Sequence, residues 1–123
     1  MSAALEQYAN ELQRRLNVRL QPVQVEQYVR VSEAALRAPS VVGVRVADKD
    51  PFTGWQVVAT SEVPAQATFG VLKVLELASE HPAWLLGLRL PTGWAFRFAG
   101  NTLLDCVSPD GETHSVRISV DDL

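Results

Sequence analysis

Short segments rich in β-branched and aromatic residues at alternate positions constrain the fold of this chain more than any other feature. A side-chain period of two is the signature of a strand with one buried face. Turn-forming residues separate these segments, and Ser108-Pro109-Asp110-Gly111 favours a hairpin between the last two. The expected strands are residues 25–31, 41–46, 55–59, 94–98, 102–107 and 113–120. The pattern predicts a mostly antiparallel sheet of about five or six strands.

Two other segments have the period of a helix. In residues 2–17 the apolar side chains fall on one helical face, and Ser2 is the expected N-cap. Residues 69–81 show the same spacing after Thr68, which is a second candidate N-cap. Both helices are expected to pack on one face of the sheet, so the sequence predicts an α+β fold.

The composition is that of one ordinary globular domain over residues 1–123. Hydrophobic residues make up 47% of the chain and charged residues 20%, which is enough apolar surface to form a core. The net charge of −3 is opposite in sign to what phosphate neutralisation requires, so no nucleic-acid partner is expected. Apolar stretches are interrupted well before the roughly 20 residues of a membrane span, so no membrane association is expected either.

The compartment is predicted from the cysteine content and the first residues. A single cysteine, Cys106, cannot form an internal disulfide, so the fold does not require an oxidising environment. The segment 1–6 has no basic stretch followed by an apolar run, so we expect no secretory signal peptide. These features favour a cytoplasmic protein.

The residue types that carry catalysis do not occur in the required patterns. His81 and His114 are far apart and lack zinc-ligand spacing, and Cys106 lies in an apolar segment where packing is its expected role. No phosphate-binding glycine loop or nucleophile elbow is present in the sequence. We therefore expect no enzyme activity, no metal and no cofactor. One alternative remains, in which Glu62 and a loop carboxylate, Asp48 or Asp50, converge as an acid pair.

The order of several short motifs resembles the Immunity protein 33 family, a group of small bacterial domains found beside secreted toxins. The most specific pieces are Gly54-Trp55, then Glu62 seven residues after the tryptophan, and then a Pro-x-Gly-x-Ala-Phe segment at residues 91–96. The similarity covers roughly residues 28–98 and leaves the first helix and the hairpin at residues 102–120 outside. Where the family commonly has Asp-Ser-Gly-Trp, this chain has Phe52-Thr53-Gly54-Trp55, which moves any role of that aspartate to Asp50.

The resemblance implies a protein that binds a cognate toxin and neutralises it by blocking its active site. The segment 48–54 is dense in turn residues and lies between two expected strands, so it should be both exposed and firmly anchored. The residues expected to contact the partner are Asp48, Asp50, Phe52, Trp55 and Glu62. A binding chaperone or adaptor that does not inhibit its partner is the alternative function. The sequence leaves self-association undetermined.

Overall fold

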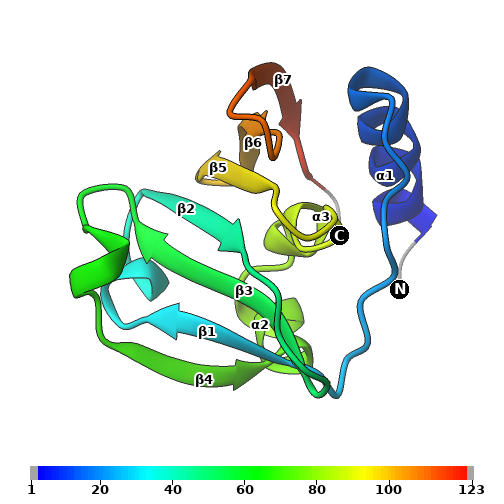
Figure 1. Cartoon of the computed structure of the whole chain (residues 1–123). Helices are drawn as coiled ribbons and strands as arrows, with labels where there is room; N and C mark the ends of the chain where they lie inside the picture. Colours follow the sequence, from blue (N-terminus) through cyan, green and yellow to red (C-terminus); the bar gives the residue numbers. More distant parts are fainter. Residues whose placement is uncertain (1–2, 122–123) are drawn as a thin grey trace.

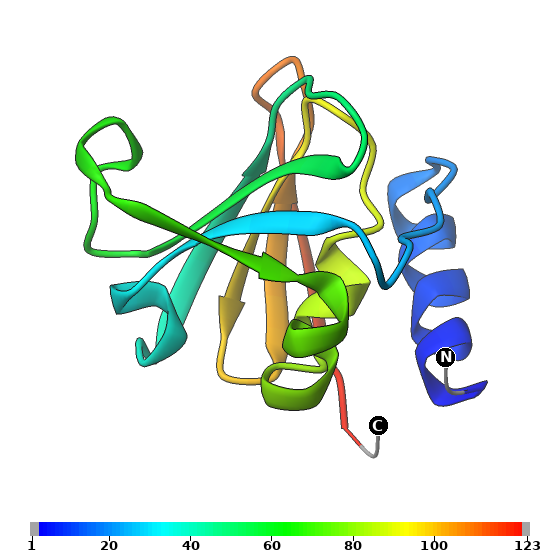
Figure 2. The same ribbon diagram turned by 90° about the horizontal axis from the view of Figure 1, so that it is seen from below.

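The computed structural model describes residues 3–121, and within that range it forms a seven-stranded mixed sheet with its α-helices on one side (Figures 1 and 2). The strand order is β4-β1-β3-β2-β5-β6-β7. The strands are β1 (Tyr28–Ser32), β2 (Ser40–Arg45), β3 (Phe52–Ala59), β4 (Phe69–Lys73), β5 (Ala95–Ala99), β6 (Thr102–Val107) and β7 (Thr113–Ser119). The helices are α1 (Ala3–Leu16), α2 (Val74–Glu80) and α3 (Trp84–Gly87), with 3₁₀ turns η1 (Ala34–Leu36) and η2 (Pro64–Gln66).

The α+β class is confirmed, and the sheet has one strand more than the upper end of the expected range. All neighbouring strands are antiparallel except β1 and β3, which run parallel. The chain passes from β1 through η1 into β2, and β3 then returns between them, which makes the sheet mixed.

Helix α1 confirms the first helical pattern. Leu5, Ala9, Leu12 and Leu16 are its buried residues, and they belong to the same apolar cluster as the inward side chains of β7. One guanidinium nitrogen of Arg15 donates to the carbonyl oxygen of Val116 and so ties the helix to that strand. The predicted cap, Ser2, lies outside the described residues.

The centre of the core is the ring of Trp55, which has no exposed surface. Its indole Nε1 donates to the carbonyl oxygen of Leu88 at 2.8 Å, and its ring centroid lies 4.9 Å from that of Phe96. Phe96 sits directly against Gly43 of β2, where an added Cβ would come within 2.3 Å of the phenyl ring. The aromatic pair thus joins β2, β3, β5 and the segment after α3.

The prediction of a helix over residues 69–81 is wrong in its first third. Phe69–Lys73 is strand β4, paired antiparallel with β1, and the helix α2 begins only at Val74. Its N-cap is Lys73, whose backbone N–H donates to the Glu76 carboxylate at 3.1 Å, so Thr68 does not cap it. The apolar residues at positions 71, 72 and 75 are compatible with a helix or with a buried strand. Pairing with β1 makes residues 69–73 a strand. This strand accounts for the seventh member of the sheet.

Two strand boundaries also differ from the expectation. The first strand begins at Tyr28 instead of Val25, because residues 24–27 form a turn in which the backbone N–H of Gln27 donates to Gln24. Strand β3 begins at Phe52, inside the segment expected to be a loop. The hairpin between β6 and β7 is confirmed, and β2 and β3 also pair antiparallel across the loop between them.

Gly54 makes the start of β3 possible, and its substitution tests that role. Its φ is +89°, and an added Cβ would lie 2.0 Å from the carbonyl oxygen of Val46. We expect Gly54→Ala to lower the free energy of unfolding by about 2 kcal/mol or more, because backbone strain and a backbone clash add. Urea titration followed by circular dichroism measures this.

The matched control is Gly70→Ala, where a Cβ meets only the carbonyl oxygen of Val31, at 3.7 Å. We expect that variant to stay within about 0.5 kcal/mol of the wild type. Equal stability of the two variants would contradict the role assigned to Gly54.

Candidate functional site

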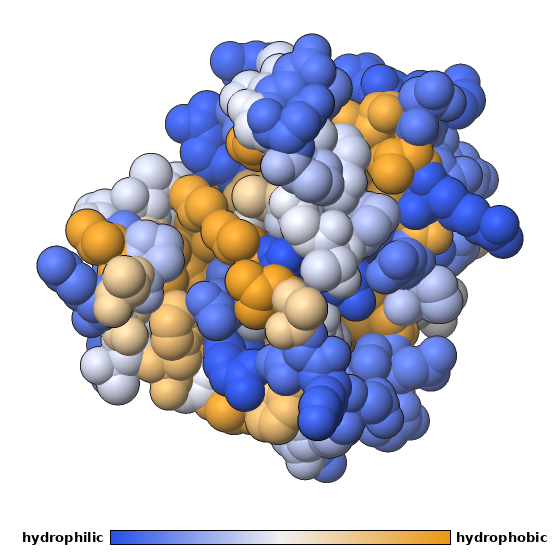
Figure 3. Space-filling view, in the orientation of Figure 1, coloured by the Kyte–Doolittle hydropathy of each residue, from blue (hydrophilic) through white to orange (hydrophobic). Residues whose placement is uncertain are grey.

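The face of the sheet opposite the helices is turned toward the reader in Figure 1, and its side chains are those that alternate with the core residues. On β1, Arg30 faces this side because its neighbours Val29 and Val31 are buried in the core. On β2, Val42 and Val44 also face this side of the sheet, and both are only half-buried. Figure 3 shows the result, an apolar band across this helix-free face with hydrophilic side chains on its margins.

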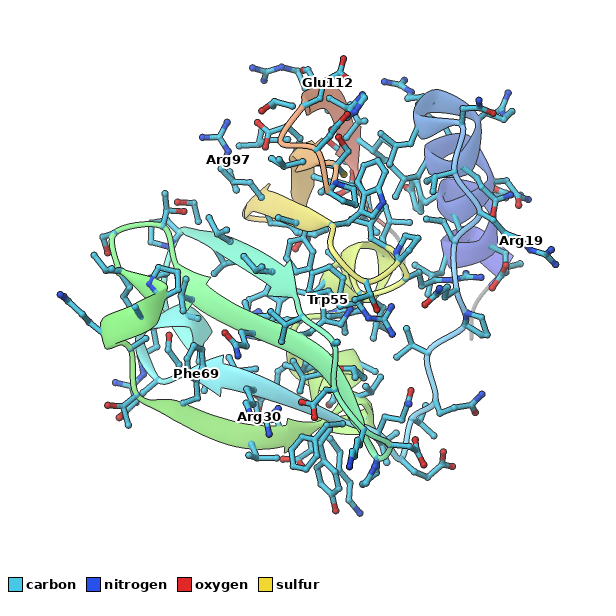
Figure 4. All side chains as sticks on the ribbon, in the orientation of Figure 1. Arg19, Arg30, Trp55, Phe69, Arg97 and Glu112 are labelled. Atoms are coloured by element: carbon cyan, nitrogen blue, oxygen red, sulfur yellow. The ribbon has the colours of Figure 1, made fainter. Side chains whose placement is uncertain are left out.

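At one end of the helix-free face, Arg30 is held between an aromatic ring and a carboxylate. Its guanidinium carbon lies 4.1 Å from the centroid of the Phe52 ring, and its Nη1 lies 2.5 Å from Oδ2 of Asp48. The ring of Tyr28 packs against Phe52, with centroids 5.5 Å apart. We call Tyr28, Arg30, Asp48, Asp50 and Phe52 the Arg30 cluster. Figure 4 shows Arg30 on this face, over β1.

The loop between β2 and β3 is fixed to β1 by hydrogen bonds, so the Arg30 cluster has a defined shape. The backbone N–H of Tyr28 donates to the carbonyl oxygen of Pro51 at 2.8 Å, and the hydroxyl of Thr53 donates to the carbonyl oxygen of Tyr28 at 3.0 Å. The side-chain amide of Gln27 donates to Oδ1 of Asp50 at 3.2 Å. The peptide bond between Asp50 and Pro51 is cis.

Asp48 is stabilised in its charged form. The backbone N–H of Lys49 donates to its Oδ1 at 2.8 Å, and together with the hydrogen bond from Arg30 this lowers the pKa of the Asp48 carboxyl below its usual value. The loop therefore presents Asp48 as a carboxylate at neutral pH, already oriented by its two donors.

Arg45 braces the loop from the core side of the sheet. Its Nε donates to the carbonyl oxygen of Thr53 at 3.0 Å, and its Nη1 donates to the carbonyl oxygen of Leu90 at 2.7 Å. Its guanidinium carbon lies 5.9 Å from the centroid of the Trp55 ring. Burial lowers the pKa of Arg45 from its usual value. The start of β3 is thus anchored to both β2 and the segment before β5.

The structure brings together three of the five residues expected to contact a partner. Asp48, Asp50 and Phe52 all belong to the Arg30 cluster, and their contact with a partner stays a prediction. Trp55 is fully buried, so its side chain presents no surface to a partner in this structure. The side chain that follows a glycine in a tight turn can point into the core or into the solvent, and that of Trp55 points into the core.

Glu62 lies at the opposite end of β3 from the Arg30 cluster. The strand runs from Phe52 to Ala59, seven steps of about 3.3 Å each, so roughly 23 Å separates its ends. Oε1 of Glu62 accepts hydrogen bonds from the hydroxyl of Ser32 and, at 2.8 Å, from the backbone N–H of Ala59. The alternative in which Glu62 forms an acid pair with Asp48 or Asp50 is therefore wrong, whereas contact of Glu62 with a partner stays a prediction.

Sequence reasoning missed Tyr28 and Arg30. The strand that contains them was predicted from its alternating valines, which form its buried face. The residues between the valines, which lie on the opposite face, were not considered as candidates. An arginine between two core valines of one strand was the available signal, because it must project from the exposed side. Its two partners come from a different strand and a loop, which a single sequence does not reveal.

The other reactive side chains of the described chain are in structural positions. Cys106 is buried, and burial raises the pKa of its thiol to about 12. The His81 ring stacks on Trp84 with centroids 4.2 Å apart, and His114 packs against Trp94. Between residues 3 and 121, no three His, Cys, Asp or Glu side chains are grouped so as to hold a metal ion.

A hollow beside β4 is lined by apolar side chains and carries one ionisable group, Glu33. A single carboxylate without a nearby base or nucleophile lining the same hollow does not make an acid–base pair. In the part of the chain that the structure describes, no helix is long and apolar enough to cross a membrane.

Comparison with known proteins identifies the family to which the chain belongs. A sequence model of the Imm33-like domain matches residues 8–108, and the chain therefore belongs to the Imm33-like domain family. The match extends beyond residues 28–98 and takes in most of α1 and all of β6, so the expectation that these two elements lie outside it is wrong. Strand β7 does lie beyond the matched residues, as expected. No curated protein and no solved structure matches the chain significantly.

The motifs that carried the resemblance serve the fold. Gly54 has positive φ, Trp55 is central to the core, and Glu62 braces the ends of β1 and β3. In the later motif, Gly93 also has positive φ, and Phe96 packs against Trp55. The recognisable residues therefore build the scaffold, and the Arg30 cluster is a partly exposed feature built upon it.

The Asp48 carboxylate predicts a pH dependence with a definite sign. Its pKa is lower in the folded protein than in the unfolded chain, so it contributes stability above the unfolded value of about 3.9, and this contribution is lost as the pH falls through the folded pKa. We expect Asp48→Asn to be less stable than the wild type at pH 7 and to lose less stability between pH 7 and pH 3. Urea titrations at both pH values measure the difference.

Glu80→Gln is the control for removal of one negative charge, since Glu80 is exposed on α2. It should lose as much stability on acidification as the wild type. An Asp48→Asn variant whose acid loss equals that of the wild type would argue against the stabilised carboxylate.

Proposed function

We propose that this protein is a cytoplasmic immunity protein that binds a cognate bacterial toxin and neutralises it by covering the active site of the toxin. Membership of the Imm33-like domain family is the observation that carries this proposal. The Arg30 cluster supports it, because the cluster combines the residue types that dominate protein interfaces with a fixed geometry. The protein acts by occupancy and has no catalytic step of its own.

The Arg30 cluster suits this role for a physical reason. Arginine and tyrosine are enriched among the residues that dominate binding energy. The guanidinium of Arg30 is already stacked on Phe52 and bonded to Asp48, so little side-chain entropy is lost when a partner covers it. Asp50 and Asp48 add negative charge beside it, which favours a partner with a basic rim around its active site.

Co-expression tests the function as a whole. The toxin gene is expressed in a bacterial host alone, with this protein, and with an Arg30→Ala variant. Growth restored by the wild-type protein supports neutralisation, and equal growth arrest with and without it contradicts the proposal. An activity assay on the purified complex separates the alternative, because a chaperone or adaptor would leave the toxin active.

Substitution of Arg30 tests which surface makes the contact. We expect Arg30→Ala to weaken toxin binding by about 2 kcal/mol or more, or roughly 30-fold, as is usual for a central interface residue. Isothermal titration calorimetry measures the change in affinity. Circular dichroism confirms that the variant is folded.

The sheet offers a closely matched control in Arg97. Arg97 pairs with Asp105 at 2.6 Å, much as Arg30 pairs with Asp48, and its side chain is exposed. It lies on β5, three strands away from β1, and Figure 4 shows it well apart from Arg30. Arg97→Ala should leave the affinity within about threefold of the wild type, since an exposed ion pair contributes little. Equal losses for both variants would contradict a contact centred on Arg30.

A further inference from the structure

Strand β4 forms an open border of the sheet. It is the last strand on its side in the strand order, and among residues 3–121 no element lies beyond it in Figure 1. The backbone N–H of Val74 donates to the carbonyl oxygen of Gln27, just before β1. In an antiparallel pair every second residue directs its backbone N–H and C=O toward the neighbouring strand, so those of Leu72 and Gly70 also point toward β1. The backbone groups of Phe69 and Val71 therefore point outward, away from the sheet.

The two borders of the sheet differ in how they resist pairing. On β7, the border at the other end, Arg117 has a φ of +47°, which interrupts regular strand geometry, and it carries a charge. Such irregularity and charge protect an edge from joining another strand. Strand β4 has neither device between Phe69 and Leu72, and Val71 is 49% exposed. An apolar, regular edge of this kind favours strand addition.

We propose that β4 pairs with β4 of a second copy of this chain, antiparallel and centred on Gly70, so that the two sheets become one. In this register Phe69 of each copy lies opposite Val71 of the other. Their outward backbone groups then form four hydrogen bonds, two on each side of the symmetry axis. The phenyl ring and the valine side chain also meet across the junction, an aromatic and β-branched pair of the kind that stabilises sheets.

Gly70 of each copy lies at the symmetry axis of this register. Its groups point inward, so the two glycines form a non-hydrogen-bonded pair, in which the Cα atoms come within about 4.5 Å of one another. The symmetry of the register makes the interface isologous, with the same residues contributed by both copies.

Charge supports the same register. The Phe69 end of β4 adjoins Ser32, whose hydroxyl donates to Glu62 and which is followed by Glu33. The other end of β4 carries Lys73. Antiparallel pairing brings Lys73 of each copy toward the acidic end of the other, which favours this orientation over a parallel one. The two-fold axis stands perpendicular to the sheet, so both Arg30 clusters lie on the same side of the dimer.

Disulfide trapping tests the register. Gly70→Cys introduces a side chain with room in the single chain, since its Cβ approaches only the carbonyl oxygen of Val31, at 3.7 Å. A Cα separation of about 4.5 Å lies within the range for a disulfide, so we expect a covalent dimer under mild oxidation. The native Cys106 is buried and does not compete. Thr113→Cys, exposed on the opposite border strand β7, is the control and should cross-link at least tenfold more slowly.

Light scattering after size-exclusion chromatography tests the association itself. We expect the wild type to elute with twice the mass of the chain at high concentration, and Val71→Lys to elute as a monomer with unchanged circular dichroism. A monomeric wild type at every concentration, a Val71→Lys variant that stays dimeric, or equal cross-linking of the two cysteine variants would overturn the proposal. Toxin neutralisation does not enter these measurements, so they stand apart from the proposed function.

Discussion

The burial of Trp55 is the constraint on which the rest of the structure depends. The indole needs both a large apolar space and a hydrogen-bond acceptor, and the fold supplies Phe96 for the first and the carbonyl oxygen of Leu88 for the second. Because the ring belongs to β3, its position fixes where that strand begins, and Gly54 provides the turn that this position requires. The guanidinium of Arg45 stabilises this arrangement by donating to the carbonyl oxygens of Thr53 and Leu90.

The exposed Arg30 cluster follows from this buried frame. Once the start of β3 is fixed, Phe52 lies beside β1, and the loop before it brings Asp48 to the guanidinium of Arg30. The proposed binding surface is therefore already ordered in the free protein, which would reduce the entropy lost on association. Among the residues that carried the resemblance, Trp55 and Phe96 are buried, and they specify the scaffold.

Sequence patterns predicted the parts of this fold that depend on local periodicity. The amphipathic helix α1 and the hairpin of β6 and β7 followed from spacing and turn residues alone. Strand β4 was misread as helix, because its apolar spacing is compatible with both and its pairing with β1 is a long-range fact. Only part of the candidate site could be predicted, for the same reason. The turn residues around Asp48 and Asp50 indicated an exposed loop, whereas the position of Arg30 beside that loop depends on the parallel pairing of β1 with β3.

The central claim is that the Arg30 cluster is a preformed docking surface for a toxin. Hydrogen–deuterium exchange, measured on the protein alone and in complex with the toxin, tests this most directly. The account predicts that residues 46–54 exchange slowly for a loop in the free protein and become further protected in the complex, together with the start of β1. Protection confined to α1 and β7, with no change in residues 46–54, would contradict it.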